Sequence, residues 1–173
     1  MPATYEPIAS QTLGSSASSV TFSSISGTFT DLILVADVTP ATGLFSFMLR
    51  INSDTGSNYS ATSLYGDGSG AYSVRRTSST YLLMSESAST QNGSRSIYQV
   101  HLQSYANTNV NKTVLGVASI PGATVERQVG LWRSTAAITS LTINNLWGTA
   151  ATSAIGSDIG SGSTFALYGI KAA

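Results

Sequence analysis

The sequence has no cysteine among its 173 residues, and charged side chains make up only 9% of it. Without cysteine there is no disulfide framework and no thiolate metal site, so packing and subunit contacts must stabilise the fold. The eight basic residues balance the eight acidic ones. This balance provides no general attraction to nucleic acid or to an anionic membrane, and we expect neither a nucleic-acid partner nor membrane insertion.

Long hydrophobic runs are also missing. No segment approaches the roughly 18 apolar residues of a membrane-spanning helix, and the N-terminus lacks the basic and apolar regions of a signal peptide. The hydrophobic fraction of 42% nevertheless argues against a disordered chain. We expect a folded, soluble protein made in the cytoplasm, and its low net charge favours assembly with itself.

The clearest pattern in the sequence is an apolar strand that runs into a polar loop, within residues 44–68. The residues of its predicted buried face recur at a period of two: Phe45, Phe47, Leu49 and Ile51. That period is typical of a strand with one buried face. Asp54 and the small polar residues after it then turn the chain.

Similar strands recur along the whole chain, separated by turn residues, and no segment has helical periodicity. Beyond the strand already described, we expect strands over residues 19–25, 29–39, 80–87, 95–105, 113–120, 125–134, 138–147 and 163–172. Some nine short strands predict an all-β fold, a two-sheet antiparallel β-sandwich of jelly-roll-like type. Residues 1–19 read as an extended N-terminal arm, and residues 20–173 as a single sandwich domain.

Two segments have a distinctive pattern of faces. Leu32 to Val35 are apolar on both faces, which is typical of a central strand covered on both sides. Residues 71–79 are polar and place Arg75 and Arg76 on opposite faces of any strand. We interpret this second segment as a connecting excursion.

The sequence offers no recognisable catalytic motif. Its single histidine, His101, shares the wetter face of its predicted strand with Gln99, and no nucleophile motif lies near it. The acidic residues are scattered, mostly in turns or at strand ends, so no carboxylate pair for glycoside hydrolysis is evident. We predict that the protein is not an enzyme and has no catalytic residues.

Oxygen-bearing residues of the polar loop are the candidates for metal binding. Asp54 and Asp67 are calcium candidates, because Ca²⁺ prefers oxygen ligands gathered from loops. The spacing Asp-x-Gly-x-Asn does not match an EF-hand, and turn-forming hydrogen bonds explain the same residues. We therefore predict no metal and no cofactor.

A candidate surface-recognition loop overlaps these positions. Its residues are Asp54, Asn58, Tyr59, Tyr65, Asp67 and Tyr72. Aromatic rings can stack on the apolar faces of sugars, while small polar residues supply hydrogen bonds. Packing in the core or at a subunit interface is the alternative role for these tyrosines, and it is the one we favour.

Four stretches together resemble small β-sandwich virion proteins of tailed bacteriophages, including those of cyanophages. They are MPATYEPIAS followed by Leu13-Gly14, FTDLILVADV at residues 29–38, LRINSDTGSNYSATSLYGDG at residues 49–68, and STFALYGI at residues 163–170. The third is the most specific, since it is similar to a strand-plus-loop signature of head-decoration and fibre-associated proteins. Ser53 departs from that signature, which more often has glycine there.

The resemblance implies a virion structural protein, most simply a capsid decoration or cement protein on the phage head. It further implies a homotrimer or another small oligomer, located in the virion and bound to the major capsid protein or another virion protein. The alternative is the receptor-binding head of a tail fibre, which would bind host surface glycans through its exposed loops.

Overall fold

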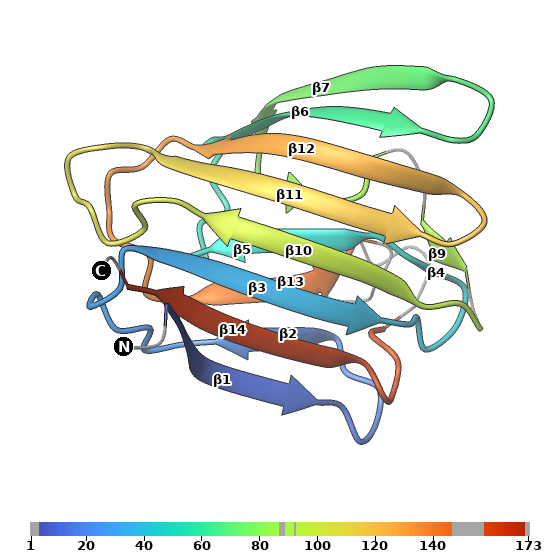
Figure 1. Ribbon diagram of the computed structural model, residues 1–173, viewed down its shortest axis with the longest axis horizontal. Helices are drawn as coiled ribbons and strands as arrows, with labels where there is room; N and C mark the ends of the chain where they lie inside the picture. Colours follow the sequence, from blue (N-terminus) through green and yellow to red (C-terminus); the bar gives the residue numbers. More distant parts are fainter. Residues whose placement is uncertain (1–3, 87–88, 92, 147–157, 172–173) are drawn as a thin grey trace.

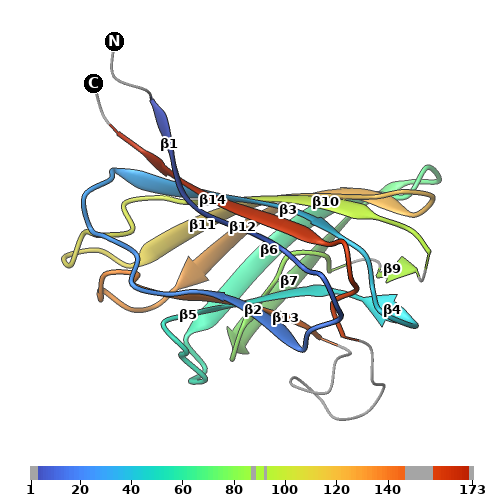
Figure 2. The same cartoon turned by 90° about the horizontal axis from the view of Figure 1, so that it is seen from below.

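The computed structural model describes residues 4–86, 89–91, 93–146 and 158–171 (Figure 1). Within these ranges the chain forms fourteen β-strands and no helix, so none of it is a membrane-spanning helix. The strands make two main antiparallel sheets that pack face to face (Figure 2). The prediction of an all-β, two-sheet sandwich is confirmed.

The strands follow the turn residues of the sequence closely. They are β1 (Tyr5–Thr12), β2 (Ser19–Phe22), β3 (Asp31–Val38), β4 (Leu44–Phe45), β5 (Phe47–Ile51), β6 (Tyr59–Gly66), β7 (Ala71–Ser79), β8 (Leu82–Leu83), β9 (Thr90–Gln91), β10 (Ser96–Leu102), β11 (Lys112–Ile120), β12 (Thr124–Trp132), β13 (Leu141–Asn145) and β14 (Thr164–Ile170).

The larger sheet has eight strands in the order β1-β14-β3-β10-β11-β12-β6-β7, and the smaller has four in the order β2-β13-β5-β8. A short pair, β4 and β9, lies beside them. Figure 1 looks onto the larger sheet, with the smaller sheet behind it. We call the side of the larger sheet that faces away from the smaller one the outer face.

The core lies between the two sheets. Alternate residues of each central strand point into it, as a period of two requires; on β12 the alternation is complete from Thr124 to Trp132. Phe45, Phe47, Leu49 and Ile51 are all fully buried, as the sequence pattern predicts. Phe47 also packs against Tyr98 of β10, with ring centroids 4.7 Å apart, which joins the two sheets.

Part of the segment expected to be an N-terminal arm belongs to the larger sheet. Residues 5–12 form β1, which pairs antiparallel with β14 from Tyr5↔Ile170 to Thr12↔Thr164. Leu13, just after β1, is buried in the core. The segment expected to be a connecting excursion is likewise a strand, β7, paired with β6 at the opposite edge of the sheet.

One expectation about coverage is not met within a single chain. The sequence predicts that β3 is covered on both sides, and its inner residues Leu32 and Leu34 are indeed fully buried. On the outer face, however, Val35 is 38% exposed. No described element of the chain lies over this side of the sheet (Figure 2).

Candidate functional site

The outer face of the larger sheet is the candidate functional site. Strand register places its side chains in rows that cross the sheet from β14 to β7. One row runs through Val35, Gln99, Val117, Arg127 and Leu64, and the next begins two residues further along each strand. Because alternate residues point outward, register alone determines which side chains share this surface.

Large apolar side chains are exposed on the outer face. We call Val35, Leu64, Ile97, Val125 and Val129 the apolar patch; their exposed fractions lie between 38% and 64%. They come from β3, β6, β10 and β12, with the half-buried Leu115 and Val117 of β11 between them. Gln99 and Arg127 stand among these side chains. Several large apolar side chains exposed on one sheet face nevertheless favour an interaction site, since exposed apolar residues occur singly on an ordinary surface.

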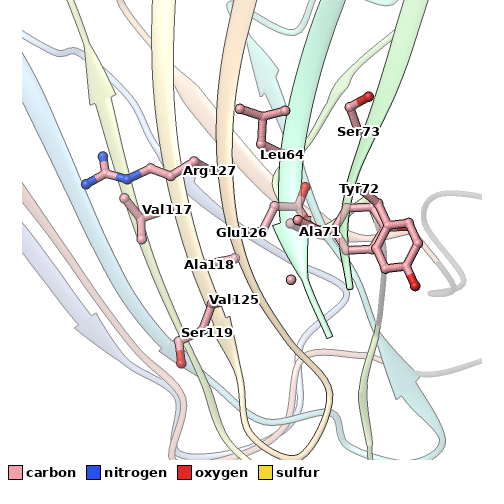
Figure 3. A pocket seen from close by; sticks show the side chains of 12 residues that line it. Leu64, Ala71, Tyr72, Ser73, Val117, Ala118, Ser119, Val125, Glu126 and Arg127 are labelled. Carbon is pink, nitrogen blue, oxygen red and sulfur yellow. The ribbon is translucent and has the colours of Figure 1, made fainter. Parts of the chain in front are cut away.

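A shallow hollow of about 720 Å³ lies over part of the apolar patch. Val117, Val125 and Leu64 contribute to it from three neighbouring strands, and Arg127 stands beside them (Figure 3). Its shape is open, and its lining is mixed: besides these aliphatic side chains it includes Tyr65 and Tyr72. Such a lining offers aliphatic surface to the side chains of another protein and aromatic rings of the kind on which sugars stack.

Charges are divided between the two halves of the outer face. The carboxylates Asp31 and Asp37 lie on β3, where they pair with His101 and Arg95. Arg127 on β12 and Arg75 on β7 lie in the other half, and their side chains make no hydrogen bond or ion pair with any described residue. The cationic half therefore carries charge that is not neutralised within the described chain.

His101 is held in place rather than free on this surface. Its Nε2 lies 2.9 Å from Asp31 Oδ2, and Asp31 Oδ1 accepts the backbone N–H of Ser104 at 2.7 Å. A carboxylate that orients an imidazole in this way is found in general-base sites and in purely structural pairs alike. His101 lines none of the five hollows whose first and last lining residues are Leu64 and Arg127, Ser60 and Arg133, Gly66 and Val125, Ile8 and Leu167, and Pro7 and Tyr168.

The residues of the candidate recognition loop form two separate clusters, at opposite ends of β6. Asp54, Asn58 and Tyr59 lie at its start. Asp54 accepts hydrogen bonds from Trp132 Nε1 at 2.7 Å, Asn58 Nδ2 at 2.9 Å and the Gly56 backbone at 2.7 Å. These bonds, above all that from Trp132, lower the pKa of Asp54. The cluster is a tightly bonded turn.

Tyr59 has no surface role in this arrangement. Its side chain is fully buried, and its hydroxyl donates to the Ile51 carbonyl and accepts from the Ile51 backbone N–H. Burial raises the pKa of Tyr59 to about 12. The ring therefore packs in the core, in agreement with the alternative role considered for the tyrosines.

The second cluster lies at the far end of β6, where β6 and β7 join. The rings of Tyr65 and Tyr72 stack on each other with centroids 5.2 Å apart. Asp67 accepts the backbone N–H groups of Ser69 and Gly70, which lower its pKa. Asp54 and Asp67 therefore cannot ligate one ion, and the described residues contain no group of three metal-ligating side chains.

The apolar patch itself was not predicted from the sequence. The signal was present, since β12 alternates the exposed Val125, Arg127 and Val129 with a second set that includes Trp132 and is buried. Alternation alone does not say which face turns inward when both carry apolar residues. The choice depends on which face the smaller sheet covers.

Comparison with known proteins gives few matches. No protein-family model and no curated protein matches the chain. Among solved structures, the alginate lyase Aly36B is similar at 14% identity over 93% of this chain and 77% of that chain, with a TM-score of 0.43. A variant of that enzyme in complex with an alginate tetrasaccharide is similar at 11% identity over 84% and 72% of the two chains, with a TM-score of 0.30.

These findings correct two predictions. The matching structures are carbohydrate-active enzymes, which contradicts the predicted function as a phage capsid decoration protein or tail-fibre receptor-binding head. They equally contradict the prediction that the protein is not an enzyme. At this low similarity the likeness concerns the path of the chain, and it assigns no substrate or reaction to this protein.

Proposed function

We propose that this protein is a self-associating subunit, and that two copies pack through the outer faces of their larger sheets. The observation that carries the proposal is the apolar patch. Five large aliphatic side chains are exposed together on one sheet face, and burying each removes apolar surface from water at about 25 cal/mol per Å². A second copy presents an identical patch, and a two-fold axis lets each patch cover the other.

The pattern of the strands supports a covered outer face. The run from Leu32 to Val35 is apolar on both sides, a pattern typical of strands buried on both faces. Within one chain the inner side is covered, whereas on the outer side Ile33 is buried and Val35 is 38% exposed. A second sheet stacked on the outer face, about 10 Å away, would cover the other side.

The size of the surface agrees with a stable dimer. The five strands from β3 to β6 span about 24 Å across the sheet at the usual strand spacing, and the nine residues of β11 span about 30 Å along it. The flat area is therefore on the order of 700 Å². Standard interfaces bury about 800 Å² on each partner.

The charges of the outer face are complementary to those of a second copy. A two-fold axis parallel to the strands, between β10 and β11, places β3 of one copy opposite β12 of the other. Asp31 and Asp37 of one copy then lie on the side that faces Arg127 of the other. The absence of net charge on the chain also removes any overall repulsion between copies.

Cross-linking through a single introduced cysteine tests which face is used. The chain has no cysteine, so Gln99→Cys supplies the one thiol, at an exposed position of β10 near the proposed axis. Two such thiols on packed outer faces lie within reach of a bismaleimide about 10 Å long. We expect covalent dimers of Gln99→Cys at micromolar protein concentration.

A cysteine away from the outer face is the matched control. Ser57 is exposed in the turn before β6, and Ser57→Cys should give no covalent dimer under the same conditions. Equal cross-linking of the two variants, or none of Gln99→Cys, would contradict packing through the outer face. Thermal melting of each variant verifies that both are folded.

A further inference from the structure

A second, smaller hollow lies at the β7 side of the outer face, and we call it the arginine hollow. Its volume is about 270 Å³, and it lies where β12, β6 and β7 run side by side. Three arginines contribute to its lining, namely Arg75, Arg76 and Arg133. It shares no residue with the larger hollow, but Val129 of the apolar patch is part of its lining, so a ligand in the arginine hollow and a second copy compete for this end of the outer face.

Two of these arginines, Arg75 and Arg133, are not neutralised by a carboxylate of the described chain. Arg133 donates only to uncharged acceptors, namely Ser60 Oγ at 3.0 Å, the Ser57 carbonyl at 3.0 Å and the Tyr59 carbonyl at 3.3 Å. These bonds fix its guanidinium plane. Arg75 pairs with no described side chain, and none of the residues lining the hollow is acidic.

The two neighbouring arginines of β7, Arg75 and Arg76, differ in their partners. Arg76 directly follows Arg75 in β7. Its Nε forms an ion pair with Glu86, whose side chain is buried. Arg75 points to the outer face, in the row of Thr62 and Val129. One arginine of this adjacent pair is therefore used within the chain, and the other is free to meet an anion.

Hydroxyl groups and an apolar floor complete the arginine hollow. Ser60 and Thr62 stand two residues apart on the same face of β6, about 7 Å along the strand. The two arginines flank them, since Arg133 bonds to Ser60 and Arg75 lies opposite Thr62. Further hydroxyls come from Thr77 and Thr113, and Val129 and Leu131 supply aliphatic surface between these polar groups.

We propose that the arginine hollow binds a carboxylated sugar. A planar guanidinium matches a carboxylate with two parallel hydrogen bonds. The surrounding hydroxyls can both donate to and accept from the hydroxyls of a sugar ring, and the aliphatic floor suits its C–H face. A bare phosphate or acetate would use the arginines but leave the row of hydroxyls and the floor without a partner.

Titration calorimetry with a short oligogalacturonate tests this proposal, with the neutral oligosaccharide of equal length and inorganic phosphate as comparison ligands. We expect saturable binding of the oligogalacturonate and at least about tenfold weaker binding of the other two, since the neutral sugar lacks the charge and phosphate lacks the sugar ring. Binding of phosphate as tight as that of the acidic sugar would overturn the assignment to a sugar. Absence of saturable binding of all three would overturn the site.

Variants on β7 and β6 locate the binding. Arg75→Gln and Thr62→Val should each weaken oligogalacturonate binding, the first by about tenfold or more. Arg95→Gln removes an equal charge from another edge of the face, where Arg95 pairs with Asp37, and should leave binding unchanged. Equal binding by wild type and Arg75→Gln would overturn the proposal.

Failure of this inference can be told apart from failure of self-association. Arg75 is on the edge strand β7 and is not part of the apolar patch, so Arg75→Gln should keep the molecular mass of wild type in solution. A loss of sugar binding without a change in mass supports the arginine hollow. A loss of both would assign the effect of Arg75 to assembly and overturn its role as a direct ligand.

Discussion

The carboxylate of Asp54 shows how one side chain organises the turn before β6. It accepts three hydrogen bonds, from an indole, an amide and a backbone N–H. All three favour the charged form, which is why its pKa lies below the usual value of 3.8 although partial burial acts in the opposite direction. The residue therefore stabilises the fold only while it is ionised.

Replacing Asp54 by asparagine should lower the free energy of unfolding by about 1–2 kcal/mol at pH 7, because the charge-assisted bonds are lost. A lowered folded-state pKa means that the unfolded chain binds the proton first as the pH falls. The stability due to Asp54 is thus complete well above pH 3.8 and is lost as the pH falls below it. In urea unfolding, the difference between wild type and variant should therefore shrink as the pH is lowered below 3.8.

Asp67→Asn is the control, since Asp67 also accepts backbone N–H groups but in a fully exposed turn. Its effect at pH 7 should be clearly smaller than that of Asp54→Asn. A difference between wild type and Asp54→Asn that persists unchanged at pH 3 would show that lost packing, and not lost charge, is responsible.

Residue-scale prediction from sequence succeeds for side chains whose partners are local. Turn-forming hydrogen bonds explain Asp54 and Asn58, as the spacing suggests. The sequence could not separate Asp54 from Asp67, because that separation depends on β6 being one continuous strand about 26 Å long. It also could not reveal that Trp132, far along the chain, donates to Asp54.

At the scale of the element, β1 shows where a polar N-terminal segment belongs. Its burial is slight, since most of its side chains are exposed, and the sequence therefore suggests an arm. Backbone pairing with β14 decides otherwise, because main-chain hydrogen bonds do not depend on side-chain pattern. Leu13 then anchors the end of this strand in the core, where its backbone N–H donates to the Ser163 carbonyl at 3.0 Å.

Leu13→Ala should lower the free energy of unfolding by about 2–4 kcal/mol, the usual effect of truncating a buried leucine. Gln11→Ala changes an exposed side chain of the same strand and should alter stability by less than about 0.5 kcal/mol. Chemical denaturation of the three proteins is the measurement. A negligible effect of Leu13→Ala would mean that residues 1–19 behave as a detached arm after all.

Strand β7 was not predicted from the sequence, for a reason related to that for β1. Its residues are polar on both faces, which resembles a loop, yet an edge strand needs a partner on one side only. Pairing with β6 is enough to keep it in continuous register from Ala71 to Arg76, before the register shifts towards Ser79. The consequence is functional, because a regular strand places Arg75 on the outer face and Arg76 on the inner one.

At the scale of the whole molecule, the sandwich leaves one of its largest surfaces uncovered. The smaller sheet has four strands and the larger has eight, and the outer face of the larger sheet has no covering element in the described chain. Sequence pattern predicts the sandwich well, because buried faces alternate strongly. It does not distinguish burial inside one chain from burial between two chains, since the same apolar residues serve both.

The most direct test of the account is the molecular mass of the unmodified protein in solution, measured by light scattering at micromolar concentration. We expect two copies of the 17.9 kDa chain. The double variant Leu64→Glu/Val125→Glu places charge in the apolar patch and should give the mass of one chain. A native protein that has the mass of one chain at every concentration, or a double variant that keeps the native mass, would contradict packing through the outer face.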